Sequence, residues 1–131
     1  MSIWTHVAGT IRVDALRIVE PIPDVMNPRK VLGPTNLYDE DNPKSTLPCG
    51  SEGSLNYDIW TNPEEHDMAA HTVSIFGDLR DYDNLDEIKK WFEDVVGKLM
   101  VRQAVLTASV EGGPTMILVL EDKHIVPAYI T

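Results

Sequence analysis

Aromatic, imidazole and charged side chains recur at every second position of several segments that have the composition of β-strands. Alternate residues of a strand point to opposite faces of its sheet, so these side chains are expected to share one face while apolar residues fill the other. The candidate binding residues are Trp4, His6, Arg12, Asp58, Trp60, Phe76 and Asp78, accompanied by Gln103 and Thr107. Aromatic residues exposed together with charged ones are typical of a surface that binds a ligand or another protein.

The same residues allow two other interpretations. The long loop or the C-terminal tail could fold over them and turn this face into a second small core. Alternatively, the carboxylates of Asp58 and Asp78 could act as acid and base in a hydrolytic reaction, provided that the fold brings them within reach of one another.

No cofactor or metal ion is expected. The histidines lack the spacing of a zinc site, and the acidic run 39–42 lacks the glycine and the distal glutamate of a calcium-binding loop. Cys49 lies between Pro48 and Gly50 in a loop, a poor place to hold a nucleophile, so it is interpreted as an incidental thiol. The four histidines are His6, His66, His71 and His124.

Length and charge limit the classes of function. With 131 residues, of which 43% are hydrophobic, the chain is expected to form one domain over residues 1–131 with one core. A formal net charge of −10 argues against direct nucleic-acid binding, which needs an excess of basic residues, and suits a basic protein partner instead. A single cysteine and the lack of a signal-like or membrane-spanning apolar run predict a soluble, cytoplasmic protein that does not bind membranes.

One amphipathic helix and a hairpin are the clearest elements. Apolar residues recur at spacings of three and four from Asn84 to Leu99, and Asn84 with Glu87 has the form of a capping box. From Val101 to Val110 the period changes to two, and a glycine-rich turn leads to a returning strand, Thr115 to Leu120. This stretch is expected to organise the rest of the chain.

The remaining elements complete an α+β domain. Strands are expected at residues 3–13, 54–60 and 70–79, and the tail 124–131 is expected to dock as a short edge strand. Residues 14–53 are interrupted by proline and glycine and form a long surface excursion, with one short helix that Asn27 caps and Pro28 begins. The prediction is an antiparallel sheet of about five strands with one main helix on one face. A ferredoxin-like arrangement satisfies this order, although its first helix would have to come from the excursion.

Three hypotheses of function follow. The first is a non-enzymatic binding or accessory module that meets a protein partner through the sheet face or an acidic surface. The second is a small enzyme or ligand-binding domain with a pocket between the excursion 14–53 and the sheet, in which Arg12 holds an anionic group and His6 or a carboxylate moves a proton. The third is an assembly subunit, a homodimer in which the strand pair Val101 to Leu120 extends across a two-fold axis.

Overall fold

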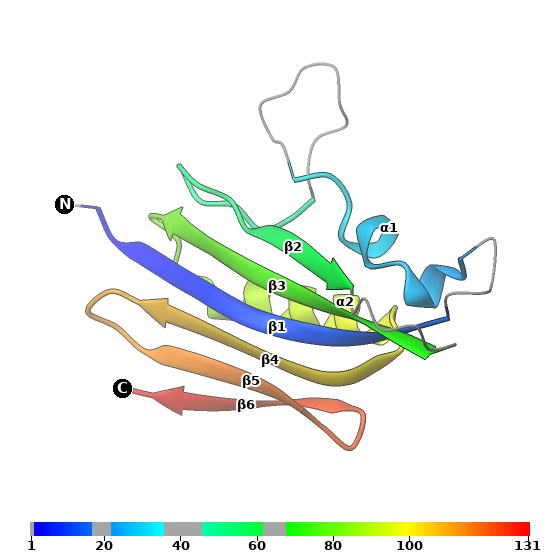
Figure 1. Cartoon of the computed structure of the whole chain (residues 1–131). Coiled ribbons are helices and arrows are strands. Elements are labelled where there is room, and N and C mark those ends of the chain that lie inside the picture. Colours follow the sequence, from blue (N-terminus) through cyan, green and yellow to red (C-terminus); the bar gives the residue numbers. More distant parts are fainter. Residues whose placement is uncertain (1, 17–21, 36–45, 62–67) are drawn as a thin grey trace.

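The computed structural model describes residues 2–16, 22–35, 46–61 and 68–131 of the chain. Its elements in chain order are β1 (Trp4–Leu16), the 3-10 helix η1 (Asp24–Met26), α1 (Pro28–Leu32), β2 (Asn56–Thr61), β3 (Met68–Arg80), α2 (Leu85–Gly97), β4 (Val101–Val110), β5 (Thr115–Glu121) and β6 (His124–Ile130). The strands form one twisted sheet, and α2 lies behind it in the view of Figure 1. The α+β class is confirmed.

The sheet has six strands in the order β2-β3-β1-β4-β5-β6, and all neighbours are antiparallel. The prediction of about five strands was wrong because the tail forms a full strand, β6, which pairs with β5 from Thr115↔Ile130 to Glu121↔His124. Asp122 and Lys123, at φ 47 and 67, make a two-residue turn between these strands. An Asp-Lys pair is a weaker turn signal than Asn-Gly, so the sequence pattern does not reveal this hairpin.

The strands do not follow one another in space as they do in sequence. β1 lies between β3 and β4, so the chain leaves β1 and returns to both of its sides (Figure 1). The β4–β5 hairpin is paired on its two outer sides, with β1 and with β6. Val105 to Ser109 and Thr115 to Val119 are therefore paired on both sides, and this part of the hairpin offers no edge for the predicted extension of Val101 to Leu120 across a two-fold axis.

The helix α2 begins as its sequence predicts. The Asn84 Oδ1 accepts a hydrogen bond from the Glu87 N–H at 3.2 Å, and the Asn84 Nδ2 donates to the Glu87 Oε2 at 3.3 Å. The helix ends at Gly97, before Leu99, and the Lys98 N–H donates to the carbonyls of Val95 and Val96. Its apolar stripe is buried: Leu85, Ile88, Phe92, Val95 and Val96.

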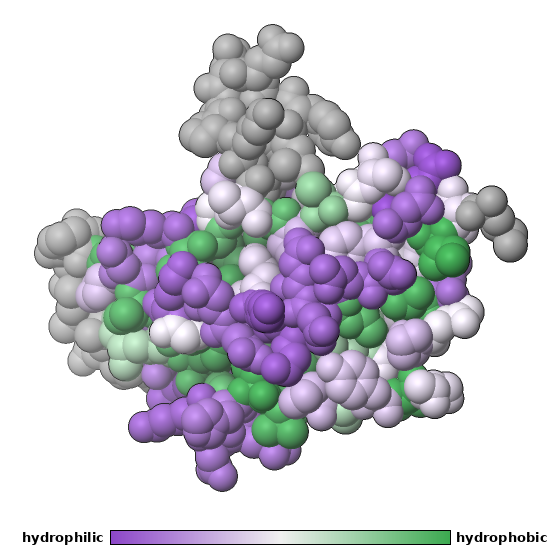
Figure 2. Space-filling model, turned by 180° about the vertical axis from the view of Figure 1, so that it is seen from behind, coloured by the Kyte–Doolittle hydropathy of each residue, from purple (hydrophilic) through white to green (hydrophobic). Residues whose placement is uncertain are grey.

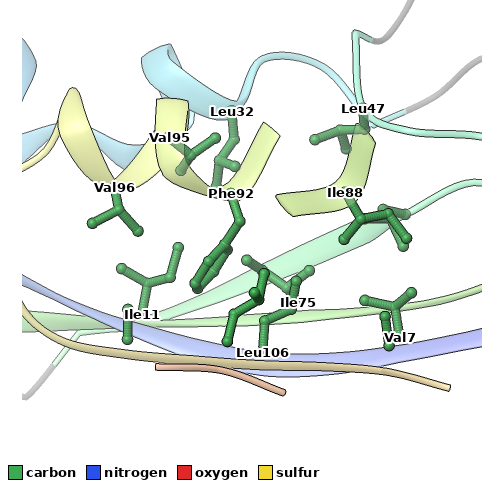
Figure 3. Close-up of a cluster of buried hydrophobic side chains, with 14 of the residues drawn as sticks. Val7, Ile11, Leu32, Leu47, Ile75, Ile88, Phe92, Val95, Val96 and Leu106 are labelled. Carbon is green, nitrogen blue, oxygen red and sulfur yellow. The ribbon is translucent and has the colours of Figure 1, made fainter. Parts of the chain in front are cut away.

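The core lies between α2 and the sheet face that it packs on, which we call the covered face. Phe92 of α2 is fully buried and points toward Ile11 and Leu106 on the sheet (Figure 3). The covered face carries Val7, Ile11, Val13, Val73, Ile75, Leu79, Ala104, Leu106, Ala108, Val110, Met116 and Leu118, all buried. The sequence predicts that residues on these strands alternate between a buried apolar face and the opposite face, and the structure confirms this alternation.

The described part of the excursion around α1 and Leu47 packs beside α2, on the same side of the sheet (Figure 3). The Asn27 Oδ1 accepts from the Lys30 N–H at 3.3 Å, Pro28 stands at the first turn of α1 and Gly33 follows at φ 77, which confirms the short helix. Leu32 and Leu47 are buried in the core next to α2 (Figure 3). Much of the predicted loop tip falls in 36–45, outside the described residues. The described parts of the excursion thus thicken the helix layer and leave the opposite face of the sheet uncovered.

Candidate functional site

The sheet face turned away from α2, which we call the open face, gathers the residues singled out from the sequence. The register places Trp4, His6 and Arg12 of β1, Asp58 and Trp60 of β2, and Phe76 and Asp78 of β3 on this one face. The same register adds further members of the face, among them Arg80, Glu121, His124, Asn56, Thr72, Ser74, Ala8, Thr10, Gln103, Val105, Thr107, Ser109, Thr115, Ile117, Val119, Val126, Ala128 and Ile130.

The aromatic residues at one side of this face are exposed. Trp60 is 57% and Phe76 is 46% exposed to solvent, although both are large apolar side chains. The tail does not fold over the face, because it is the edge strand β6. In the described part of the chain nothing covers the open face, so the interpretation as a second small core finds no support there.

A second exposed apolar group lies at the other side of the face. Val119 of β5 and Val126 and Ile130 of β6 are 36%, 41% and 58% exposed, and the register places Val119 directly opposite Val126. These residues were not among the candidate binding residues, although strands were expected at Thr115 to Leu120 and, as a short edge strand, at 124–131. The alternation of Val126, Ala128 and Ile130 was the available signal.

His6 is the centre of a small charged cluster on the open face. Its Nδ1 lies 2.6 Å from the Asp78 Oδ1 on β3, and its Nε2 lies 3.7 Å from the Glu111 Oε2 in the turn after β4. The hydrogen bond to Asp78 is the main cause that raises the pKa of His6, against a small loss of hydration. The structure therefore brings His6 and Asp78 together as partners across two strands.

Glu111 is a further member of this cluster that the sequence analysis assigned only to a turn. Its Oε1 accepts a hydrogen bond from the Trp4 N–H at 3.0 Å, and its own N–H donates to the Trp4 carbonyl at 2.9 Å. The two bonds fix the turn against the start of β1. Nothing in the period of the sequence indicates this contact, because the two residues are 107 positions apart.

Asp78, His6 and Ser109 stand on three neighbouring strands, in the order of an acid, a base and a hydroxyl. The Ser109 Oγ, however, is hydrogen-bonded to the Thr115 Oγ1 at 2.8 Å, and the His6 Nε2 faces Glu111. A nucleophile must be within hydrogen-bond reach of its base, and no such bond joins Ser109 to His6. Asp78, His6 and Ser109 are therefore polar neighbours on the sheet, and they do not have the hydrogen bonds of a catalytic triad.

The other candidate residues are not assembled for chemistry. Asp58 stands opposite Ser74 on β3, four residues from Asp78, which separates the two carboxylates by about 13 Å along the strands. Arg12 and His6 are six residues apart on β1, or about 20 Å. The acid–base pair and the anion-holding arginine of the enzyme hypothesis therefore lie too far apart to act on one small substrate.

A groove of about 880 Å³ lies on the opposite side of the molecule, between the end of α2 and the β5–β6 hairpin. Its apolar lining includes Val96, Leu99 and Ile125, and an ion pair between Arg102 and Asp14 stands at its rim. Seen from this side, hydrophilic residues gather over the middle of the molecule with hydrophobic patches between them (Figure 2). The predicted pocket between the excursion and the sheet differs from this groove, to which Asp14 alone contributes among the described residues of 14–53.

Within the described ranges, no cluster of three or more His, Cys, Asp or Glu side chains is arranged to hold a metal ion. In the same residues, every helix is too short or too polar to span a membrane. The described chemistry is thus that of hydrogen bonds, ion pairs and exposed apolar surface.

Comparison with protein-family models, with curated proteins and with solved structures found no match for this chain. The geometry of the open face is therefore the main indication of function.

Proposed function

We propose that this chain is a protein-binding module that docks a partner protein on the open face of its sheet. The observation that carries the proposal is the exposure of Trp60 and Phe76 on a face that no described segment covers. Aromatic residues are enriched at protein interfaces because they bury a large area at a small cost in side-chain entropy.

The form of the face favours a protein over a small molecule. It is a broad surface of six strands, and the groove that would suit a small ligand lies on the other side of the sheet. His6 and Asp78 in the polar middle would then orient the partner through hydrogen bonds, while the apolar side chains supply most of the buried area. Binding through this face should persist at high salt. A basic partner attracted by the net charge of −10 would instead dissociate as salt rises.

Site-specific photocrosslinking tests this proposal. Phe76 is replaced by p-benzoylphenylalanine in the full chain, expressed in cells of its own source, and Lys90, exposed on the outer side of α2, is replaced in the same way as the matched control. Illumination should join a defined protein to the chain at position 76 and not at position 90. Equal adducts from the two positions, or none from position 76, would overturn the proposal.

A second candidate function is supported by the groove beside α2. Its volume of about 880 Å³ is within the range of ligand sites, and its apolar lining with a charged rim suits a mainly apolar small molecule. Native mass spectrometry of the purified chain tests this candidate. A bound metabolite that is lost in Leu99→Gln, and retained in Phe76→Ala, would favour the groove over the open face.

For the fold, we propose a ferredoxin-like arrangement that β5 and β6 extend. The support is the order β2-β3-β1-β4, in which the chain crosses from β1 to β2 and from β3 to β4 and all neighbours are antiparallel. Here α1 with η1 replaces the first long helix. The cytoplasmic location remains a prediction, which fluorescence microscopy of a tagged chain would test.

A further inference from the structure

We propose that the partner on the open face is a second copy of this chain, which stacks on it as a two-sheet sandwich. This inference depends on the proposed function, since it names the occupant of the same surface. It uses three observations: the distribution of apolar side chains over the face, the area of the face and the state of the sheet edge.

The apolar side chains form two flanks with a polar middle. One flank contains Trp60 and Phe76 on β2 and β3, and the other contains Ile117, Val119 and Val126 on β5 and β6. The middle strand β1 presents mostly polar or small residues, which are His6, Ala8, Thr10 and Arg12, and one aromatic residue, Trp4, at its start. A single flat apolar patch would leave part of a partner's surface unmatched, whereas two flanks can match one another.

A two-fold axis parallel to the strands, over the β1–β4 pair, makes the face complementary to itself. It places β3 over β5 of the second copy and β2 over β6, with each residue at an unchanged level along the strands. The register puts Phe76 and Ile117 at the same level, so these two apolar side chains meet across the axis. The axis also places polar β1 over β4 of the second copy. Two sheets that stack with nearly aligned strands, about 10 Å apart, are a common protein architecture.

The area of the face is sufficient for a specific dimer. Six strands at about 4.8 Å spacing, over the seven residues of β5 and β6, give a projected area of roughly 650 Å² per copy. Pleated side chains increase the accessible area beyond this value. Standard specific interfaces bury about 800 Å² per partner, so the face has the size that such an interface needs.

The β6 edge of the sheet is a poorer place for association. Pro127 stands in the middle of the edge strand β6 and has no N–H to donate to a further strand. Stacking through the face avoids this obstacle. The high net charge does not oppose stacking strongly, because much of the acidic character of the described residues lies away from this face, on α2 and at its start: Asp81, Asp83, Asp86, Glu87, Glu93 and Asp94.

The first test is the mass of the full chain in solution, measured by light scattering after gel filtration over a range of micromolar concentrations and at low and high salt. We expect a dimer that persists at high salt, and at least a tenfold weaker association in Phe76→Lys and in Val119→Lys. Tyr129→Lys is the matched control, because Tyr129 is equally exposed on β6 but points to the side of α2. Circular dichroism establishes that each variant is folded.

A crosslinking test fixes the geometry. In a Cys49→Ser background, chains with Phe76→Cys are mixed with chains that carry Ile117→Cys and treated with a short thiol crosslinker. The mixture should form covalent dimers, whereas Phe76→Cys alone should not, since the axis places its two copies about 14 Å apart sideways.

Two outcomes would overturn the proposal. If the chain is monomeric at every concentration while position 76 still crosslinks to a different protein, self-association is wrong and the protein-binding function stands. If the dimer survives both lysine variants on the open face and is lost in Tyr129→Lys, the copies meet elsewhere. A monomer without any adduct at position 76 would overturn both proposals.

Discussion

The covered face and the open face of this sheet are built on the same strands, yet their side chains differ completely in exposure. On β1, Val7 and Ile11 are buried beneath α2, while His6 and Arg12, one residue away from each, are exposed. The backbone offers two surfaces, and the amphipathic helix with the described part of the excursion covers one of them. The difference shows that the fold is complete without the open face, which leaves that face available for binding.

The pKa values of two histidines on opposite faces of the sheet are shifted in opposite directions. His6 on the open face lies beside Asp78, and this partner raises the pKa of its imidazole. His71 shares the side of the sheet on which Val73 is buried, its Nδ1 lies 2.8 Å from the Thr61 Oγ1, and burial lowers its pKa. A charged partner dominates at the exposed His6, and desolvation dominates at the half-buried His71.

The largest expected difference between the faces is in the free energy of unfolding. Phe92→Ala removes a fully buried ring from the covered face and should cost about 3–5 kcal/mol. Phe76→Ala, on the open face, should cost less, about 1 kcal/mol, because Phe76 is already 46% exposed. Urea unfolding of dilute protein measures both values. Similar losses for the two variants would mean that the open face is buried in solution.

A backbone contact beneath the covered face predicts the next effect. A Cβ at Gly9 would lie 2.3 Å from the Val105 carbonyl oxygen and 2.8 Å from the Leu106 Cα, so Gly9→Ala should destabilise the fold by about 1–3 kcal/mol. The control is Gly97→Ala at the end of α2, where a Cβ meets nothing within 4 Å. This variant should be neutral or slightly stabilising. Thermal unfolding distinguishes the two, and a stable Gly9→Ala variant would contradict the close approach of β1 and β4.

The attachment of the helix over the covered face can be weakened separately. Asn84→Ala removes the side-chain acceptor of the Glu87 N–H, and this loss of an N-cap should cost about 1 kcal/mol. Asn84→Asp retains the acceptor and should have nearly the stability of the wild type. Hydrogen exchange of the first amides of α2 measures the change locally. Unchanged exchange in Asn84→Ala would show that the cap contributes nothing.

The two histidines should give the smallest effects, with opposite dependence on pH. The pKa of His6 is raised in the folded state, so the protonated imidazole stabilises the fold. This contribution to the free energy of unfolding is fully present below the ordinary pKa of 6.5 and is lost as pH rises through the raised pKa. The pKa of His71 is lowered, so its neutral form favours the fold, and stability falls as pH decreases below 6.5. His6→Gln should therefore destabilise most in acid, whereas His71→Gln should reduce the loss of stability in acid. Unfolding series and NMR titration of both imidazoles test these signs.

Much of the fold follows from local patterns. The cap at Asn84, the stripe of α2, the alternation on β1 and β4 and the short helix after Asn27 are each encoded within a few residues, and the structure confirms them. The sixth strand was predicted only as a short docked tail and was left out of the strand count, because its turn, Asp122-Lys123, has an uncommon sequence and because Pro127 resembles the end of a strand. In this chain, local sequence patterns predict a strand pair well only where the residues of the connecting turn are common ones, such as glycine.

The surface was predicted less completely, for a different reason. Membership of the open face follows from period two once the strands are known, so Trp60, Phe76 and His6 could be placed on it from the sequence. Their distances depend on strand order, which decides that His6 meets Asp78 and that Arg12 and Asp58 do not join them. The contact of Glu111 with Trp4 is a property of the assembled sheet alone.

The central position of β1 also sets the order in which the chain can become ordered during synthesis. This strand is made first, but its partner β3 follows some fifty residues later, and Val110, the partner of Thr5 on β4, later still. Until then the residues of β1 have no neighbours on either side, and closing such long loops slows folding. The nascent chain should therefore expose an apolar, unpaired strand to the ribosome surface and to chaperones for most of its translation, and acquire its structure only near the end.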